Sequence, residues 1–157
     1  MIPSETLAWR AAQRLAHKRV AFTNGCFDLL HTGHLALLTA ARQAADALIV
    51  AVNTDSSTRR LKGDKRPIVP ELERVELLLA LEPVDQVVLF DEDTPLQAIL
   101  ALHPDVLVKG ADWSEENIVG AAEVKGWGGE VVRVPLRAGL STTNLVQRVL
   151  DVYGKGE

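Results

Sequence analysis

The stretch that decides the fold is residues 20–38, VAFTNGCFDLLHTGHLALL. Residues 20–23 are an apolar run typical of a buried strand, and the turn signal Asn24-Gly25 follows them. From Leu35 onward, apolar residues recur at helical spacing. A strand, a glycine-bearing turn and a helix in this order leave unpaired backbone N–H groups at the helix start, where the helix dipole favours an anion. The stretch therefore predicts a phosphate-binding junction between a strand and a helix.

Two histidines stand at this junction. His31 and His34 are three residues apart and fall on one face of the first helical turn, and Gly33 between them lets a ligand approach the backbone closely. Imidazoles hydrogen-bond phosphate oxygens, so we expect this pair to bind phosphate; a plain helix cap is the alternative. The only nearby cysteine is Cys26 and no third histidine is close in sequence, so we predict no protein metal site.

The segment GCFDLLHTGH resembles the signature of the nucleotidyltransferase superfamily that contains the cytidylyltransferases and pantetheine-phosphate adenylyltransferase. In that superfamily the His-x-Gly-His element holds the phosphates of a nucleotide. The resemblance implies a fold of the HIGH type and places a nucleotide on His31 and His34.

Composition limits the other possibilities. The 157 residues suit a single domain over 1–157, and an apolar share of 47% suits a well-packed α/β core. A net charge of −4 argues against a nucleic-acid partner, and the single cysteine excludes an internal disulfide. The sequence shows no signal peptide and no run of transmembrane length, so we expect a cytoplasmic domain without a membrane partner.

Predicted strands and helices alternate along the chain. Their order predicts an α/β, Rossmann-like, doubly wound parallel sheet of five strands with helices on both faces, with its ligand at the carboxyl ends of the strands. The fingerprints of dinucleotide oxidoreductases and of P-loop ATPases are absent. The strands are expected at 20–23, 47–52, 84–90, 105–109 and 130–134, and the helices at 4–17, from 35, and at 71–81, 94–103, 114–125 and 141–153. The first helix is expected to be capped by Ser4 and to bury Leu7, Ala8, Ala11, Ala12 and Leu15; the helix at 71–81 is expected to bury Leu72, Val75, Leu78 and Leu79.

Three further motifs carry charge or hydroxyl groups. Residues 59–66 hold five cations against one carboxylate in a segment predicted to be a loop, which could close over a polyanion as a flexible clamp or be merely solvated. Ser141-Thr142-Thr143 opens the last helix, as an ordinary N-cap or as a phosphate cradle. Lys109 ends a predicted strand before Gly110, where its burial would be costly without an anion.

Together these groups suit a triphosphate plus a second phosphate. No nucleophile paired with a base is evident, so we expect a phosphate oxygen to attack an α-phosphorus directly and in line, expelling pyrophosphate. Mg²⁺ is expected as the cofactor, held mainly through the nucleotide phosphates, because the sequence offers no carboxylate cage.

Five further segments resemble the adenylyltransferase domain of ADP-heptose synthase. They are AVNTDSSTRRLKGDKRP, LEPVDQVVLFDEDTP, PDVLVKGADW, GGEVVRVP and LSTTNLVQRV. The resemblance implies that ATP and D-glycero-D-manno-heptose 1-phosphate, a sugar 1-phosphate, give ADP-heptose for the lipopolysaccharide inner core. It also implies a homodimer. Many such synthases resemble a fusion with an N-terminal sugar kinase, from which this sequence departs, so we expect a separate sugar kinase upstream in the pathway.

The resemblance assigns roles by position. His31, His34 and Lys62 would be catalytic, and Asn53 and Asp55 would lie near the sugar phosphate. Related cytidylyltransferases carry Arg where Leu136 stands here, so the resemblance assigns no triphosphate contact to Arg137. The nucleotide-binding set would be Asn24, Gly25, Phe27, Gly33, Lys109, Gly110, Ser141, Thr142 and Thr143.

Other activities remain open from the sequence. A glycerol-3-phosphate-type cytidylyltransferase, or an enzyme of GDP-heptose or FAD synthesis, would need the same phosphate-binding groups, because the choice of base depends on backbone contacts. A nucleotide-sensing module without turnover is the alternative outside enzymes.

Overall fold

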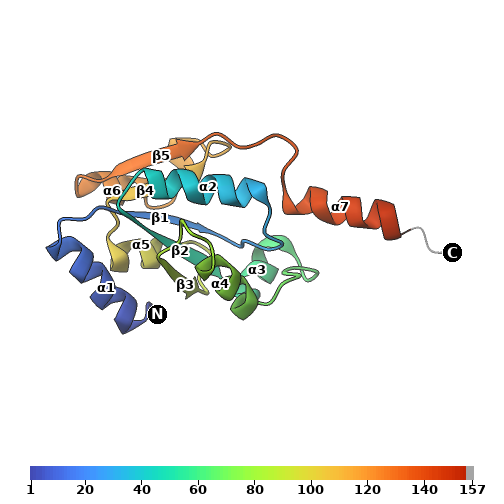
Figure 1. Cartoon of the computed structure of the whole chain (residues 1–157), viewed down its shortest axis with the longest axis horizontal. Coiled ribbons are helices and arrows are strands. Elements are labelled where there is room, and N and C mark those ends of the chain that lie inside the picture. Colours follow the sequence, from blue (N-terminus) through green and yellow to red (C-terminus); the bar gives the residue numbers. More distant parts are fainter. Residues whose placement is uncertain (155–157) are drawn as a thin grey trace.

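A parallel five-stranded sheet lies between two layers of helices in the computed structural model, which describes residues 1–154 (Figure 1). The spatial order of the strands is β3-β2-β1-β4-β5 and every pair is parallel. This confirms the predicted doubly wound architecture. The strands are β1 (Val20–Gly25), β2 (Ala47–Asn53), β3 (Gln86–Phe90), β4 (Val106–Gly110) and β5 (Glu130–Val134).

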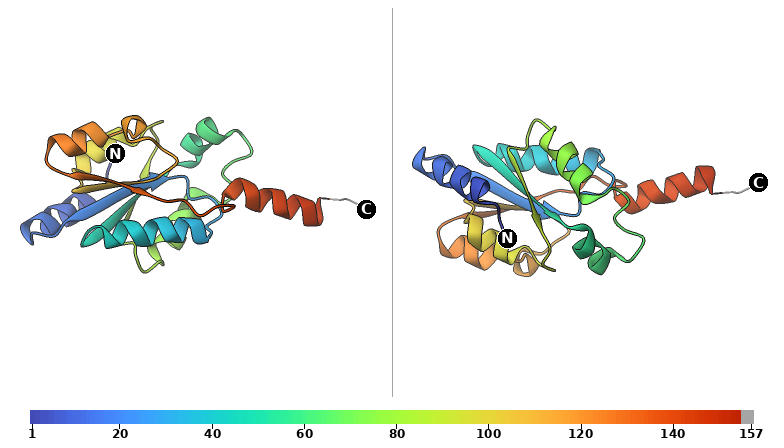
Figure 2. Two further views of the ribbon diagram at one scale, coloured as in Figure 1. Left: turned by 90° about the horizontal axis from the view of Figure 1, so that it is seen from above. Right: turned by 90° about the horizontal axis from the view of Figure 1, so that it is seen from below.

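The helices are divided between the two faces of the sheet (Figure 2). Apolar side chains of α2 and α4 pack on one face, and those of α5, α6 and the N-terminal segment with α1 pack on the other. The last helix, α7, projects away from the body of the protein (Figure 1). The helices are α1 (Ser4–Leu15), α2 (Thr32–Gln43), α3 (Asp55–Lys62), α4 (Glu71–Leu79), α5 (Leu96–Leu102), the 3-10 turn η1 (Glu115–Asn117), α6 (Ala121–Gly126) and α7 (Thr142–Tyr153).

The strand order reverses beside β1, and the sheet opens there. β1 pairs with β2 along its whole length, from Val20 to Gly25, but with β4 only at Ala21 and Phe22. The two central strands therefore separate before their carboxyl ends. A crevice at such a reversal is where doubly wound sheets bind their ligands.

Several predicted elements differ from the structure. Residues 55–62, expected in a loop, form α3, because Thr54 caps it by accepting a hydrogen bond from the backbone N–H of Ser57. The expected helix at 114–125 is divided into η1 and α6, since Gly120 has a left-handed φ of 86°. Ser4 does not cap α1, whose N-cap position is Pro3.

The predicted inner face of α1 is wrong. Leu7, Ala8, Ala11, Ala12 and Leu15 are all exposed, whereas Arg10 is buried. The Arg10 guanidinium donates to the carbonyls of Leu102 and His103 and to the Asp105 carboxylate, which ties α1 to the end of α5. A similar error affects α4: Leu72 and Leu79 are exposed, and Leu78 is buried together with Arg74.

No helix within residues 1–154 combines the length and the apolar character needed to cross a membrane.

The two faces of α1 can be separated by mutation. Arg10→Ala takes a donor from two backbone carbonyls and from the Asp105 carboxylate, which keeps only the backbone N–H of Val20, so we expect it to lower the free energy of unfolding by about 2–4 kcal/mol. Leu15→Gln, at a side chain that is 82% exposed, should change it by less than about 0.5 kcal/mol. Urea unfolding followed by circular dichroism measures both. Equal losses for the two variants would contradict this assignment of the buried face.

Candidate active site

The two histidines form a reciprocal cap at the start of α2. His31 is the N-cap residue, and its Nδ1 accepts the backbone N–H of Gly33 at 3.1 Å. His34 Nδ1 in turn accepts the backbone N–H of His31 at 3.3 Å, and the two rings stack with their centroids 3.9 Å apart. Two N–H groups of the helix start are therefore satisfied by the same pair of rings. The capping role proposed as an alternative and the phosphate-binding role are compatible, because capping uses only one nitrogen of each ring.

The cap fixes the protonation of both rings. A nitrogen that accepts a hydrogen bond carries no proton, so each neutral ring holds its proton on Nε2. Burial, and next the neighbouring His31, lower the pKa of His34 to about 4, and burial also lowers the pKa of His31. At neutral pH both rings are thus uncharged and each offers one Nε2–H donor to a ligand.

The start of α7 lies against the start of α2. A Cβ on Gly33 would be 2.8 Å from the His31 ring and 3.2 Å from the Cβ of Leu140, so only glycine fits between them. Ser141 caps α7 by accepting the backbone N–H of Asn144, and Thr142 Oγ1 donates to the carbonyl of Asp28 at 2.7 Å. Two helix N-termini, each with a positive dipole end, therefore meet at one edge of the sheet (Figure 1).

A cavity of about 310 Å³ opens at the carboxyl ends of the central strands. Lys109 lies over the ring of Trp113, with its Nζ 5.9 Å from the ring centroid. Burial lowers the pKa of Lys109 to about 8, so its charge is held in a poorly solvated place that favours an anion. Asn24 Oδ1 is buried with no hydrogen-bond partner among the described residues. The lining residues are Asn24, Asn53, Leu61, Lys62, Phe90, Asp93, Thr94, Pro95, Lys109, Trp113, Asn117, Ile118 and Val119.

Four of the predicted site residues, Asn24, Asn53, Lys62 and Lys109, line this cavity. The predicted histidines and Ser141 lie instead at the starts of α2 and α7, and two other predicted residues serve different purposes. Phe27 is only 4% exposed and packs beneath His34, with ring centroids 5.4 Å apart, so it supports the histidine instead of offering its ring to a nucleotide. The Asp55 carboxylate already accepts a hydrogen bond from Arg74 at 2.8 Å. Asn53 lines the cavity as expected, and its amide donates to Ser57 Oγ at 3.0 Å.

The basic segment at 59–66 is only in part the loop that the sequence predicted. Its first half is the end of α3, where Arg60 pairs with Asp93 at 2.9 Å. At its other end, Arg66 pairs with the buried Asp28 at 2.6 Å. Lys62 is exposed at the rim of the cavity, and it is the cation of this segment that lines the site.

Sequence reasoning missed the residues that join the loops of the site. Arg74 is 1% exposed and donates to the carbonyls of Val69, Cys26 and Asn53. Its signal was its spacing, four residues before Leu78 on the buried stripe of α4, where a charged residue is unusual. Arg137, by contrast, is exposed in the connection that precedes α7.

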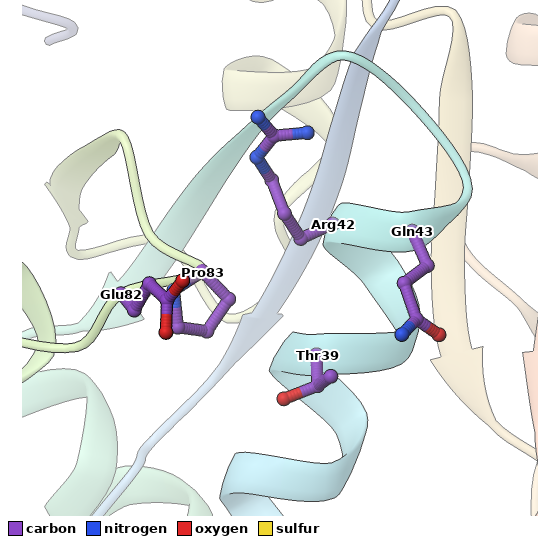
Figure 3. A pocket seen from close by; sticks show the side chains of 5 residues that line it. All are labelled: Thr39, Arg42, Gln43, Glu82 and Pro83. Carbon is purple, nitrogen blue, oxygen red and sulfur yellow. The ribbon is translucent and has the colours of Figure 1, made fainter.

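A second hollow, of about 330 Å³, lies at the opposite end of the strands, near their amino ends, between the end of α2 and the loop before β3 (Figure 3). Its arginine, Arg42, pairs with Asp85 and donates to the carbonyl of Ala45. None of the predicted site residues lines it.

The fold and the site together define an α/β nucleotide-binding protein of the nucleotidyltransferase type. The model of the cytidylyltransferase-like family matches residues 22–148, and the chain belongs to this family.

Similar proteins agree with this assignment. The bifunctional protein HldE of Trichlorobacter lovleyi is 52% identical over 91% of this chain and 29% of that protein, and HldE of Caulobacter vibrioides is 56% identical over 83% and 27%. The chain thus spans less than a third of the length of these relatives. The crystal structure of the lipopolysaccharide core biosynthesis protein from Thermoplasma volcanium is 29% identical, with a TM-score of 0.66, and the match covers 76% of this chain and 98% of that one.

The buried neutral state of His34 gives a pH dependence of stability. Its pKa in the folded protein lies below the ordinary 6.5, so the unfolded chain takes up the proton first and stability falls as the pH drops from about 6.5 toward 4. His34→Gln keeps a neutral acceptor for the cap. We therefore expect its Tm to fall less than that of the wild type between about pH 6.5 and 4.5 in calorimetry. His17→Asn, at an exposed histidine outside the site, should keep the wild-type slope; identical slopes for all three proteins would contradict the buried neutral ring.

Proposed function

We propose that this protein transfers AMP from ATP to D-glycero-D-manno-heptose 1-phosphate, giving ADP-heptose and pyrophosphate. The observation that carries the proposal is that two neutral histidine donors and two helix N-termini lie on the same side of the sheet, the carboxyl ends of its strands, as a cavity lined by Lys109. The similarity to bifunctional HldE proteins and to a lipopolysaccharide core biosynthesis protein supports the choice of the heptose substrate.

The triphosphate is assigned to the helix side of the site. The Nε2–H groups of His31 and His34 would donate to the α-phosphate, where negative charge grows during the reaction. The first N–H groups of α7, together with the hydroxyls of Ser141 and Thr143, would receive the other phosphates.

Magnesium is expected to be bound through the nucleotide. The described residues contain no cluster of three histidine, cysteine or carboxylate side chains that could hold a metal ion. We propose that the ligands of the ion are mainly phosphate oxygens and water. When bound, Mg²⁺ would neutralise charge on the triphosphate.

The acceptor is assigned to the cavity. Lys109 and Lys62 would bind its phosphate, and the apolar and polar lining would surround the sugar. One oxygen of the acceptor phosphate attacks the α-phosphorus, and the bond from that phosphorus to the bridging oxygen breaks as pyrophosphate leaves. The attacking oxygen is already ionised, so no general base is needed, and catalysis depends on positioning and on charge neutralisation.

The setting of the enzyme follows from the same proposal. Its acceptor is a sugar phosphate of the kind that a sugar kinase reaction supplies. We also propose that it is a homodimer that acts in the cytoplasm.

Substrate use tests the proposal directly. Pyrophosphate release should be measured with ATP, CTP and GTP against heptose 1-phosphate, glycerol 3-phosphate and FMN, in the presence of Mg²⁺. We expect turnover with ATP and the heptose phosphate. Turnover restricted to CTP with glycerol 3-phosphate would overturn the heptose assignment, and ATP binding without any turnover would indicate a nucleotide sensor.

The two roles of His31 can be separated by mutation. Asn is a good N-cap residue, so His31→Asn should keep the start of α2 and the Tm while losing the Nε2–H donor. Removing one preorganised donor to a developing charge costs roughly 10²–10³ in kcat, and we expect a loss of this order. His31→Ala should lose the cap as well and show a lower Tm. Near-normal kcat in His31→Asn would show that His31 only caps the helix.

A further inference from the structure

Asp28 is a fully buried carboxylate in the loop between β1 and α2. Its side chain is 0% exposed, and Oδ2 accepts Arg66 Nε at 2.6 Å and the backbone N–H of Ile68 at 2.8 Å. Oδ1 accepts the backbone N–H of Val69 at 2.9 Å. Both oxygens are therefore engaged by residues 66–69, about forty positions further along the chain.

The backbone of Asp28 joins a third segment to this point. Its carbonyl accepts the hydroxyl of Thr142, the first residue of α7. Asp28 also lies three residues before His31 and acts electrostatically on His34. One residue thus connects the histidine pair, the segment that follows Lys62, and the phosphate-binding end of α7.

The Asp28 carboxylate, which pairs with Arg66, stays ionised in spite of its burial. Burial alone would raise the pKa of Asp28, but the hydrogen bonds from Val69, Ile68 and Arg66 outweigh it and hold the pKa below its ordinary value. All donors to this carboxylate come from one segment, so the ionised form binds that segment as a unit. If residues 66–69 moved away, the buried Asp28 carboxylate would lose these hydrogen-bond donors while still charged, which is costly.

We propose that Asp28 is a positioning residue, which holds Lys62 and the N-terminus of α7 in register with His31 and His34 for the transfer reaction. This role rests on the proposed function, because turnover is one of the quantities that would reveal it. The contacts of Asp28 do not depend on which sugar is the acceptor. Asp28 is too deeply buried to meet a substrate, so it acts only through the segments that it joins. Arg66 accordingly belongs to the framework of the site and not to its phosphate ligands.

The test compares two aspartates, Asp28 and Asp85, each of which accepts a backbone N–H and pairs with an arginine. Asp28→Asn keeps the size of the side chain but turns an NH₂ group toward donors, so part of the bonding to residues 66–69 is lost. The control is Asp85→Asn, because Asp85 also accepts a backbone N–H, from Leu48 at 2.8 Å, and pairs with an arginine, Arg42, at 3.3 Å. Asp85 lies at the opposite end of the strands from the site.

Three measurements follow the role of Asp28. Misplacement of catalytic groups by about 1 Å costs on the order of a hundredfold, and we expect a loss of this order in kcat/KM for Mg-ATP in Asp28→Asn, measured well below its Tm. The dissociation constant for Mg-ATP without acceptor should rise. Trypsin cleavage after Lys62 and Lys65 should be faster than in the wild type. Asp85→Asn should lower only the Tm.

A second pair of variants keeps the test decisive if Asp28→Asn does not fold. Arg66→Gln removes the cation but leaves Asp28 its two backbone donors, and Arg66→Lys restores the charge, so the lysine variant should recover part of the turnover that the glutamine variant loses. If Asp28→Asn and Arg66→Gln changed only the Tm, as the control does, the positioning role would be wrong. If the wild type released no pyrophosphate with any acceptor, the proposed function would fail, while ATP affinity and trypsin cleavage would still decide the role of Asp28.

Discussion

The carboxyl edge of the sheet depends on the hydrogen bonding of one buried guanidinium, that of Arg74. It donates to the carbonyls of Cys26 and Asn53, which follow or end the central strands, and to the carbonyl of Val69 and the carboxylate of Asp55. Burying this cation is tolerable only because its donors are matched by acceptors from four segments. The same bonds join the chain at or just beyond the ends of β1 and β2, where the hydrogen-bond ladder between these two strands finishes. The loop that leads from β1 to His31 and the helix that leads from β2 to Lys62 both start beside this framework.

Two kinds of attraction are arranged on that framework. On the helix side, the donors are N–H groups: the imidazoles of His31 and His34 and the unpaired amides that open α7. On the strand side, Lys109 and Lys62 supply full charges beside the cavity. A phosphoryl transfer needs both, since the reacting phosphorus must be oriented while two anionic reactants are brought together.

The sequence was sufficient for those parts that local patterns determine. The alternation of apolar strands and amphipathic helices predicted the five parallel strands, and the spacing of His31 and His34 predicted that both rings lie on one face of the first turn of α2. Prediction from the sequence failed where a contact with a residue far along the chain determines which side chain is buried. Arg10 is buried because it meets carbonyls more than ninety residues away, and this overrides the apolar pattern of α1. Arg66 is held by its ion pair with the buried Asp28. No count of the charges in residues 59–66 could indicate this distant partner.

The neutrality of the histidine pair has a consequence for the energetics of the site in the salt of a cell. Attraction between the lysines and phosphate groups is weakened by mobile ions wherever water reaches them. A hydrogen bond from an uncharged ring depends instead on direction and distance, so in the proposed function the geometry that His31 and His34 would impose on a phosphate persists when ionic strength rises. The protein would thus separate how strongly its anionic reactants are attracted from how accurately they are oriented. A change of ionic environment would alter the occupancy of the site much more than the alignment of the phosphorus within it.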